Sequence, residues 1–296
     1  MKPYFTIAII FAITQLIGIY AGVALIQEAY RTPEMREISV APMPSQDDPF
    51  NALFFIAYIL FGAAMIILVS RFYKGAMLFR LLELMVIVTA SSIVFFAIFI
   101  RFFSLDFVDA FLLGGAFGVL LGVAKFIWAD VKNVAAVISS SGVGAIFGFS
   151  LGFFPTTLFI ILLSIYDYVA VFKTRHMIEM ARELSTRQLS FAVTAKSVPS
   201  KKPKENKAEY VERANREGER LDLGTGDLSV PVMISVSAYS LGPNGLIYSF
   251  ASAIGATVSL YLLLRFVSKR RVFLPALPPI CLGSMVALLI SILLFP

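Results

Sequence analysis

Long apolar runs that carry almost no charge are the feature that most constrains this chain. Only 15% of the residues are charged, against about a quarter in an ordinary soluble domain, and the charges crowd into a few short loops. Runs of about 17–25 apolar residues are long enough to cross a bilayer as helices. Nine such runs are 4–27, 51–70, 77–100, 107–124, 133–152, 155–173, 224–241, 244–266 and 273–295. We therefore expect an all-α membrane protein, a bundle of nine transmembrane helices.

The distribution of basic residues predicts the orientation of these spans. With a cytosolic N-terminus, 22 of the 25 lysine and arginine residues fall in cytosolic segments, and the outer segments hold only Arg31, Arg36 and Arg101. Cytosolic loops carry such an excess of basic residues. The seventh span is the weakest because it contains Pro231, but its omission would place Arg265 and the basic residues after it outside. We predict nine spans, with the N-terminus cytosolic and the C-terminus outside.

Composition also excludes several classes of function. The net charge of +6 would suggest nucleic acid in a soluble protein, but here the basic residues face the inner leaflet, so no nucleic-acid partner is expected. One cysteine, Cys281, and one histidine, His176, exclude an intrachain disulfide and leave too few ligands for zinc. We expect no metal and no cofactor. The first apolar run is too long for a signal peptide and lacks a small-residue exit, so it is assigned as the first span.

The polar and apolar segments divide the chain into three parts. We expect an N-terminal six-span membrane region (1–173), a cytosolic flexible loop (174–223) and a C-terminal three-span membrane region (224–296). Within the loop, Lys196–Lys207 is charged and contains prolines, so disorder is expected, and Tyr210–Leu221 has the composition of a short surface helix. Glycines repeat every fourth residue in two spans and predict close helix packing. They are Gly114, Gly118 and Gly122, and Gly144, Gly148 and Gly152.

Acidic residues at membrane depth are the candidates for chemistry. Of 19 acidic residues, only Glu83, Asp167 and Asp227 lie clearly inside apolar runs. Each ionisable group in hydrocarbon costs roughly 2.5–3.5 kcal/mol or more, so it marks a functional site by default. Glu83 follows Arg80 by three residues, and an i,i+3 ion pair is the simplest account of it. Asp167 has no basic partner in its own span.

The two aspartates reach a similar depth on consecutive antiparallel spans. Asp167 precedes Lys173 by six residues and Asp227 follows Arg220 by seven, which places them roughly 9 and 10 Å below the inner boundary if helical. Both are therefore expected at one level.

Backbone-breaking residues lie at the same level. Gly224 and Gly226 precede Asp227 and permit close approach and non-helical backbone. Three prolines lie in the segment from Leu274 to Pro279 and resist regular helix. Irregular backbone at membrane depth is tolerated where it is buried in protein or lines a wet cavity. We expect this segment to border a water-filled site near both aspartates.

Two carboxyl groups, water and exposed backbone suit aspartyl proteolysis. One carboxylate acts as a base on water while the other, protonated, polarises the scissile carbonyl. Two close carboxyl groups share a proton because both cannot ionise cheaply, so their titration belongs to the pair. The sequence alone also allows a plainer account, in which both acids are buried and satisfied by backbone or tyrosine groups.

Three short motifs carry a family resemblance. Tyr166-Asp167, Gly224-Thr225-Gly226-Asp227 and Pro275-Ala276-Leu277 resemble the YD, GxGD and PAL motifs of presenilins and signal peptide peptidases. They occur in family order on predicted spans six, seven and nine, and the resemblance covers essentially the whole chain. The short N-terminus and compact loop resemble a microbial (archaeal) presenilin homologue.

The resemblance implies a function and a set of site residues. It implies intramembrane aspartyl proteolysis with Asp167 and Asp227 catalytic, and with Gly224, Gly226, Pro275, Ala276 and Leu277 shaping the active site and binding substrate. Tyr166 is either a hydrogen-bond donor to the site or a packing residue. Pro275–Leu277 alternatively marks only a helix start. The implied partners are single-span or helical membrane-protein substrates in the lipid bilayer, and a homo-oligomer is compatible with the sequence. The location is the cell membrane in a microbe or an endomembrane in a eukaryote.

Two rival functions share some of these features. A proton- or ion-coupled transporter or a cation leak channel would also use intramembrane acids and broken helices. Against it, the sequence shows no inverted repeat, and the aspartates lie near one face instead of the midplane. A prepilin-peptidase-like enzyme also uses GxGD, but the placement of YD and PAL does not support it.

Overall fold

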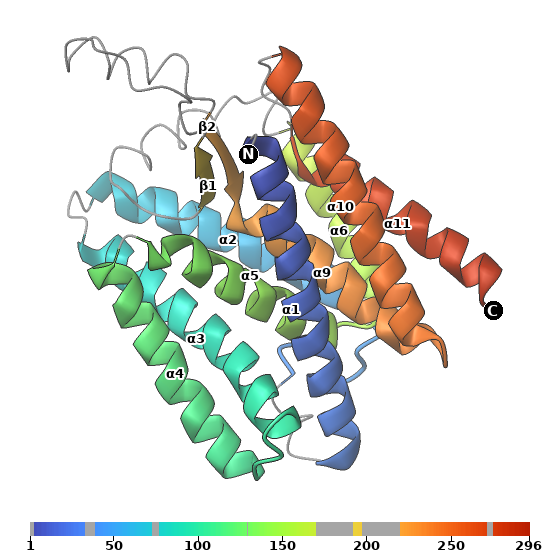
Figure 1. Ribbon diagram of the computed structural model, residues 1–296, viewed down its shortest axis with the longest axis horizontal. Helices are drawn as coiled ribbons and strands as arrows, with labels where there is room; N and C mark the ends of the chain where they lie inside the picture. The colour runs from blue at the N-terminus through green and yellow to red at the C-terminus, as the bar shows by residue number, and fades with distance from the viewer. Residues whose placement is uncertain are drawn as a thin grey trace.

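The computed structural model describes residues 3–32, 39–72, 77–128, 130–169, 192–196, 220–270 and 275–296. This part of the chain is predominantly helical (Figure 1). Its elements are α1 (Pro3–Arg31), α2 (Phe50–Phe72), α3 (Met77–Arg101), α4 (Phe107–Ile127), α5 (Val131–Ser150), α6 (Phe153–Val169), β1 (Ala192–Lys196), β2 (Arg220–Gly224), α9 (Thr225–Ser237), the 3-10 helix η3 (Ala238–Leu241), α10 (Gly245–Arg270) and α11 (Leu277–Leu294).

The helices coincide with the predicted apolar spans. Within the described ranges, six helices are long and apolar enough to cross a membrane, namely α1, α3, α4, α5, α10 and α11. Shorter apolar helical segments lie at Phe50–Ile66 and Phe153–Val169. The weakest predicted span, 224–241, is formed by α9 and η3 together, with Pro231 inside α9. The chain is an integral membrane protein with several passes.

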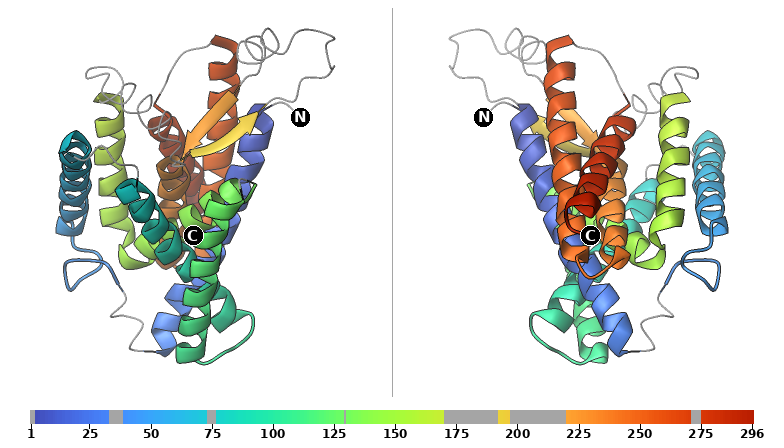
Figure 2. Two further views of the ribbon diagram at one scale, coloured as in Figure 1. Left: turned by 90° about the vertical axis from the view of Figure 1, so that its left-hand side faces the viewer. Right: turned by 90° about the vertical axis from the view of Figure 1, so that its right-hand side faces the viewer.

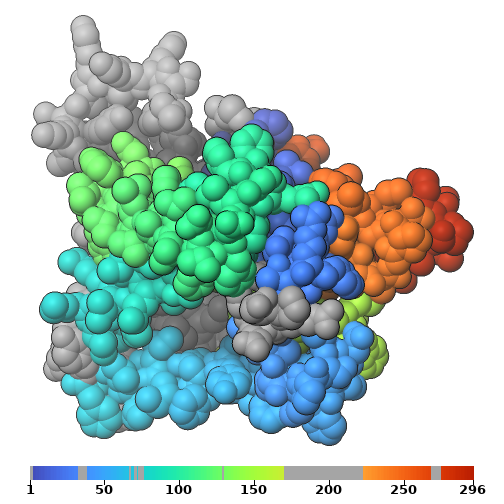
Figure 3. Space-filling view, turned by 90° about the horizontal axis from the view of Figure 1, so that it is seen from below, coloured from blue at the N-terminus to red at the C-terminus, as the bar shows by residue number. Residues whose placement is uncertain are grey.

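The bundle is organised around α5 and α9. Helix α9 contacts α1, α5, α6, α10 and α11, and α5 also contacts α1 and α3. The α3–α4 pair covers one flank and the α10–α11 pair the other (Figure 1), while α2 packs on α6 at the edge (Figure 2). Seen from the end away from the strands, α1 lies between the α3–α4 pair and α10 (Figure 3). Nine of the thirteen residues of α9 are buried in protein, whereas α2 and α4 expose many large apolar side chains, as lipid-facing helices do.

Glycines permit the close contacts of the central helices. A Cβ atom built on Gly18 of α1 would lie 2.3 Å from Cγ1 of Val232, and one on Gly144 of α5 would lie 2.5 Å from its Cβ. The glycines of α4 approach the α3 backbone or side chains in the same way, so the packing role predicted for both stripes is confirmed. Gly152 is the exception, because it faces Asp47 in the α1–α2 loop.

The buried glutamate of α3 has a different partner from the one expected. Glu83 is 3% exposed and forms an ion pair with Lys125, near the end of α4, whereas Arg80 is exposed. The expectation of an i,i+3 pair with Arg80 was wrong. The α3–α4 pairing brings the end of one helix beside the start of the other, and this contact between helices is not visible in local spacing.

Two short strands correct the expectation of a wholly flexible 174–223 loop. β1 pairs antiparallel with β2, in a register that places Ala192 opposite Gly224 and Lys196 opposite Arg220. Lys196 was expected to be disordered, and Arg220 and Leu221 were expected to be helical; residues 197–219 lie outside the described part. Strands of five residues show no useful periodicity, and their hydrogen bonds join segments far apart in the sequence. β1 also contacts α1 and α5.

The chain ends lie at opposite ends of the bundle. Tyr4, in the first turn of α1, packs against the cluster that contains Leu223 of β2. At the other end, the carbonyl oxygen of Phe295 accepts hydrogen bonds from Asn244 Nδ2 (3.3 Å) and the Tyr248 hydroxyl (2.6 Å). Asn244 lies in the turn between η3 and α10.

Candidate active site

The two intramembrane aspartates lie at the end of the bundle that carries the strands. Asp167 lies two residues before Val169, the end of α6, and is 8% exposed. Asp227 lies in the first turn of α9, which follows β2 directly and has Gly224 as its N-cap. The unpaired N–H groups of a helix N-terminus favour a carboxylate at that place. The local sequence thus places one acid at a helix end and the other at a helix start.

Helix packing brings these two carboxyl groups together with the third motif. The side chains of Asp167 and Asp227 interact electrostatically. The Asp167 carboxyl group is also within hydrogen-bonding reach of the Leu277 backbone, and that of Asp227 is within reach of the Gly224 backbone. The helices α6, α9 and α11 contact one another pairwise. The structure therefore joins residues from all three sequence motifs in one place.

Leu277 begins α11, so its backbone N–H has no partner inside that helix. α11 begins at Leu277 with Ala276 as N-cap, and Pro278 and Pro279 occupy its first turn. Proline is tolerated there because the first N–H groups of a helix have no partner inside it. The expectation that all three prolines resist regular helix was wrong for Pro278 and Pro279, which lie inside α11. Pro275 lies before the helix begins. Pro278 and Pro279 have no N–H, so the N–H of Leu277 is the last donor before them.

The two glycines of the GxGD motif have different surroundings. Gly224 has extended backbone (φ −62°, ψ 146°), and a Cβ atom there would lie 3.3 Å from Oδ2 of Asp227. Gly226 lies inside the helical turn, so the expectation of non-helical backbone holds only at Gly224. A Cβ atom on Gly226 would meet nothing within 4 Å. Among the described residues there is therefore open space beside Gly226, the neighbour of Asp227 in the sequence.

Tyr166 lies on a different side of α6 from its neighbour. Its side chain is 44% exposed, whereas Asp167 is buried. This exposure excludes the role of a buried packing residue. Of the residues predicted to form the site, Tyr166 is the one whose position gives the least support for a role there.

Comparison with known proteins identifies the family. The sequence model of the family described as signal-peptide peptidase, presenilin aspartyl protease matches residues 8–296. This chain belongs to that family. A search of curated proteins found no match.

Solved presenilin-family structures have the same fold. One, "Structure of a presenilin family intramembrane aspartate protease in C222 space group", has a TM-score of 0.66 at 22% identity and covers 99% of each chain. The other, of the same description in the P2 space group, has a TM-score of 0.65 at 21% identity and also covers 99% of each chain. By its family, the present chain is a presenilin-family intramembrane aspartic protease that acts on membrane proteins in the bilayer. Neither comparison supports the transporter or channel alternative.

Gln15 is a residue of this presenilin-family chain that the sequence reasoning missed. It is 1% exposed on α1, and its Nε2 lies 3.4 Å from the carbonyl oxygen of Leu228, the residue after Asp227. Its Oε1 accepts no hydrogen bond from the described residues. A lone amide in an apolar span is costly to bury, and this signal was available in the sequence.

A second missed pair lies one helical turn beyond Asp167 and Leu277. The Cys281 thiol is within hydrogen-bonding reach of the Ser164 side chain, and it lies near both aspartates. Ser164 precedes Asp167 by three residues, and Cys281 follows Leu277 by four, so helical spacing places each pair on one face. The α6–α11 contact is therefore made at two successive levels.

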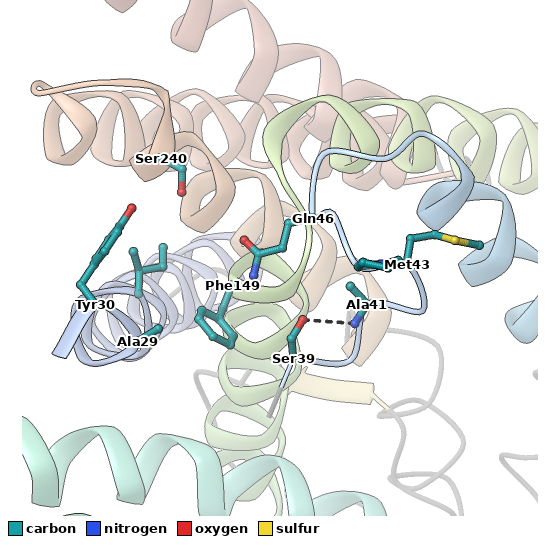
Figure 4. A pocket seen from close by; sticks show the side chains of 10 residues that line it. Ala29, Tyr30, Ser39, Ala41, Met43, Gln46, Phe149 and Ser240 are labelled. Atoms are coloured by element: carbon teal, nitrogen blue, oxygen red, sulfur yellow. Dashed lines mark hydrogen bonds between the residues drawn. The ribbon is translucent and has the colours of Figure 1, made fainter. Parts of the chain in front are cut away.

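The other end of the bundle carries a cavity of about 510 Å³. It lies between the end of α1, the α1–α2 loop, α5 and η3, and its lining includes Tyr30, Ser39, Gln46 and Ser240 (Figure 4). The Ser39 hydroxyl accepts a hydrogen bond from the N–H of Ala41 (3.3 Å). The described residues of its lining include no Asp, Glu, His, Lys or Arg, so they supply no charged group for catalysis. Among the described residues, no three metal-ligating side chains cluster together.

Proposed function

We propose that this protein hydrolyses peptide bonds within transmembrane segments of other membrane proteins, with Asp167 and Asp227 as its catalytic groups. The observation that carries the proposal is the meeting of the two carboxyl groups, on antiparallel helices, beside the Leu277 backbone at the start of α11. Membership of the aspartyl protease family supports it.

Two carboxyl groups that share one proton can perform each step of the hydrolysis. The ionised one takes a proton from water, and the oxygen of that water attacks the carbonyl carbon. The protonated one donates to the carbonyl oxygen, which gives a neutral tetrahedral diol. The C–N bond then breaks as the nitrogen receives a proton from one carboxyl group and a hydroxyl of the diol gives its proton to the other. The enzyme returns to its starting state with one water consumed.

A substrate helix must unwind before its peptide bonds reach these groups. The strand β2, which ends at Gly224, offers extended backbone near the aspartates, and an unwound strand can pair with such backbone. In this proposal Gly226 leaves room for the substrate beside Asp227, because a Cβ atom there would meet nothing within 4 Å. Gly224, Pro275, Ala276 and Leu277 shape the remaining wall, and Tyr166 contacts substrate from its exposed position.

The basic residues support the assignment of sides. With the N-terminus in the cytosol, the 1–173 and 224–296 regions each contribute one aspartate on the cytosolic side of a nine-span bundle, and the 174–223 segment connects them there. Cleavage then falls in the cytosolic half of the substrate span. The protein resides in the cell membrane of a microbe or in an endomembrane of a eukaryote, and no metal or cofactor takes part.

The test is proteolysis of a single-span substrate by the purified protein in bilayer discs. Mass spectrometry of the products should place the cut within the span, in the cytosolic half. Asp167→Asn and Asp227→Asn should each abolish cleavage, because either change removes one of the two proton carriers. Asp109→Asn, which alters an acid in the first turn of α4, is the matched control and should retain full activity. Substantial turnover by either of the first two variants would refute the proposed pair.

A further inference from the structure

A shallow trough of about 220 Å³ follows the outer surface of α1, toward the end of the bundle away from the aspartates. Its floor is formed by Leu16, Tyr20, Val23 and Gln27. These residues are spaced four, three and four apart, so they form one stripe on one face of the helix. The stripe spans eleven steps of the helix, or about 16 Å at about 1.5 Å per residue.

Two other helices form the walls of the trough. Arg101, the last residue of α3, stands on one side, and Phe250 in the second turn of α10 stands on the other. This is the arrangement seen end-on, where α1 lies between the α3–α4 pair and α10 (Figure 3). The trough therefore faces the membrane and joins three helices.

The trough is apolar at one end and polar at the other. At the end nearer the bundle centre the floor is apolar, with Leu16 exposed, and at the other end it reaches Gln27 and the charge of Arg101. Arg101 is itself exposed, and no acidic side chain forms an ion pair with it in the described part of the chain. A charge at the polar end and apolar surface toward the membrane centre match the shape and polarity of a lipid.

We propose that this trough binds one anionic phospholipid from the leaflet opposite the aspartates, with an acyl chain on the α1 stripe and the phosphate group on Arg101. A guanidinium group binds phosphate oxygens through two parallel hydrogen bonds, and basic residues at the membrane surface attract anionic headgroups. The apolar part of the stripe, from Leu16 to Val23, is about 10 Å long at about 1.5 Å per residue, which is roughly two-thirds of half the hydrocarbon thickness of a bilayer. The choline headgroup of a zwitterionic lipid carries its own cation, which competes with Arg101 for the phosphate.

Bound lipid would stabilise the bundle without joining the chemistry. The opposite side of α1 packs on α9 through Gly18 and Gly22, whose Cβ positions lie against Val232 and Val236. A lipid in the trough therefore presses α1 toward α9 and connects it to α3 and α10. The expected effect is a higher melting temperature in anionic lipid, independent of whether Asp167 and Asp227 are intact.

The test measures binding of phosphatidylglycerol and phosphatidylcholine to the delipidated full chain by native mass spectrometry, with thermal melting as a second readout. The wild type should bind one phosphatidylglycerol saturably, at least tenfold more tightly than phosphatidylcholine. Arg101→Gln removes the charge and Val23→Trp fills the trough while keeping Arg101, so both should lose that preference and the rise in melting temperature. Arg31→Gln removes a charge at the same end, outside the trough, and should behave as wild type.

Three results would overturn the proposal. The first is equal binding of the two lipids by the wild type. The second is an undiminished preference for phosphatidylglycerol in either Arg101→Gln or Val23→Trp. The third is a loss of preference in Arg31→Gln as large as in Arg101→Gln, which would indicate general attraction to charge. If Arg101→Gln does not fold, Val23→Trp decides the outcome.

Discussion

Gly18→Ala is the substitution whose consequence for the aspartates is most directly given by the structure. A Cβ atom at position 18 would lie 2.3, 3.0 and 3.2 Å from three side-chain atoms of Val232. Carbon atoms pack at about 3.5–4.0 Å, so the nearest pair would have to separate by more than about 1 Å. Val232 has little room to move, because Gly144 of α5 also packs closely on it and a valine in a helix has one strongly preferred rotamer.

The displacement should therefore be transmitted to α9, whose first turn holds Asp227. Extra methylene groups in a packed core cost about 1–3 kcal/mol, and a misplacement of about 1 Å near the chemistry can cost about 100-fold in rate. We expect Gly18→Ala to lower the melting temperature and to reduce kcat by one to two orders of magnitude, about 10- to 100-fold. Val232→Ala should relieve the clash, so the double variant should recover stability and activity relative to Gly18→Ala alone.

The assay compares proteolytic rate per folded molecule and melting temperature for the two single variants and the double variant. Side chains in contact show coupling energies of about 0.5–3 kcal/mol in such a cycle. Gly115→Ala is the matched control, since a Cβ atom there meets nothing within 4 Å and alanine favours helix over glycine. Gly18→Ala that behaves like Gly115→Ala, or a double variant no better than the product of the singles, would refute this account of the α1–α9 contact.

Three further predictions concern the site and its supports. Gln15→Leu removes the amide that reaches the Leu228 carbonyl and should lower kcat about tenfold with little change in KM. The control is Ser141→Ala, which breaks an α1–α5 hydrogen bond of 3.0 Å and should lower only the melting temperature. Equal losses of kcat in the two variants would show that the Gln15 effect is merely structural. The pH profile of kcat/KM should be bell-shaped because the two aspartates share a proton, and a flat profile between acid and neutral pH would count against the pair. Lys125→Met removes the cation that pairs with the buried carboxylate of Glu83 and should lower the free energy of unfolding by about 3–5 kcal/mol, measured by denaturant unfolding. The double variant Glu83→Gln/Lys125→Met should recover most of that loss. Similar stability in the single and double variants would contradict the ion pair.

The helices were predictable because each one depends on residues that are close together in the sequence. Apolar runs of membrane-crossing length gave the helices and most of their bounds, including the weak seventh run interrupted by Pro231. The glycine stripe that ends at Gly152 also predicted close packing, and it failed only at that last residue, which faces a loop. These features depend on residues a few positions apart, and helical geometry converts such spacing directly into faces.

Contacts between distant segments could not be predicted in this way. The pairing of Lys196 with Arg220 across the β1–β2 register joins two strands too short to show a pattern. Glu83 had a plausible neighbour at i−3, but the antiparallel α3–α4 packing supplied Lys125 instead. The Gln15 amide reaches Leu228, 213 positions away, and nothing near Gln15 in the sequence indicates that partner.

The sequence by itself determined that the chain is a membrane protein and that the YD, GxGD and PAL motifs are present. It also predicted that Asp167 and Asp227 lie at a similar depth in the membrane. It could do so because the cost of charge in hydrocarbon makes buried acids rare and conspicuous. Only the tertiary structure decided that the Leu277 backbone lies beside Asp167, that Gly226 has open space beside it among the described residues, and that α1 supports α9 through Gly18. Those are properties of how helices pack against one another, and packing depends on side-chain shapes from segments that the sequence order does not bring together.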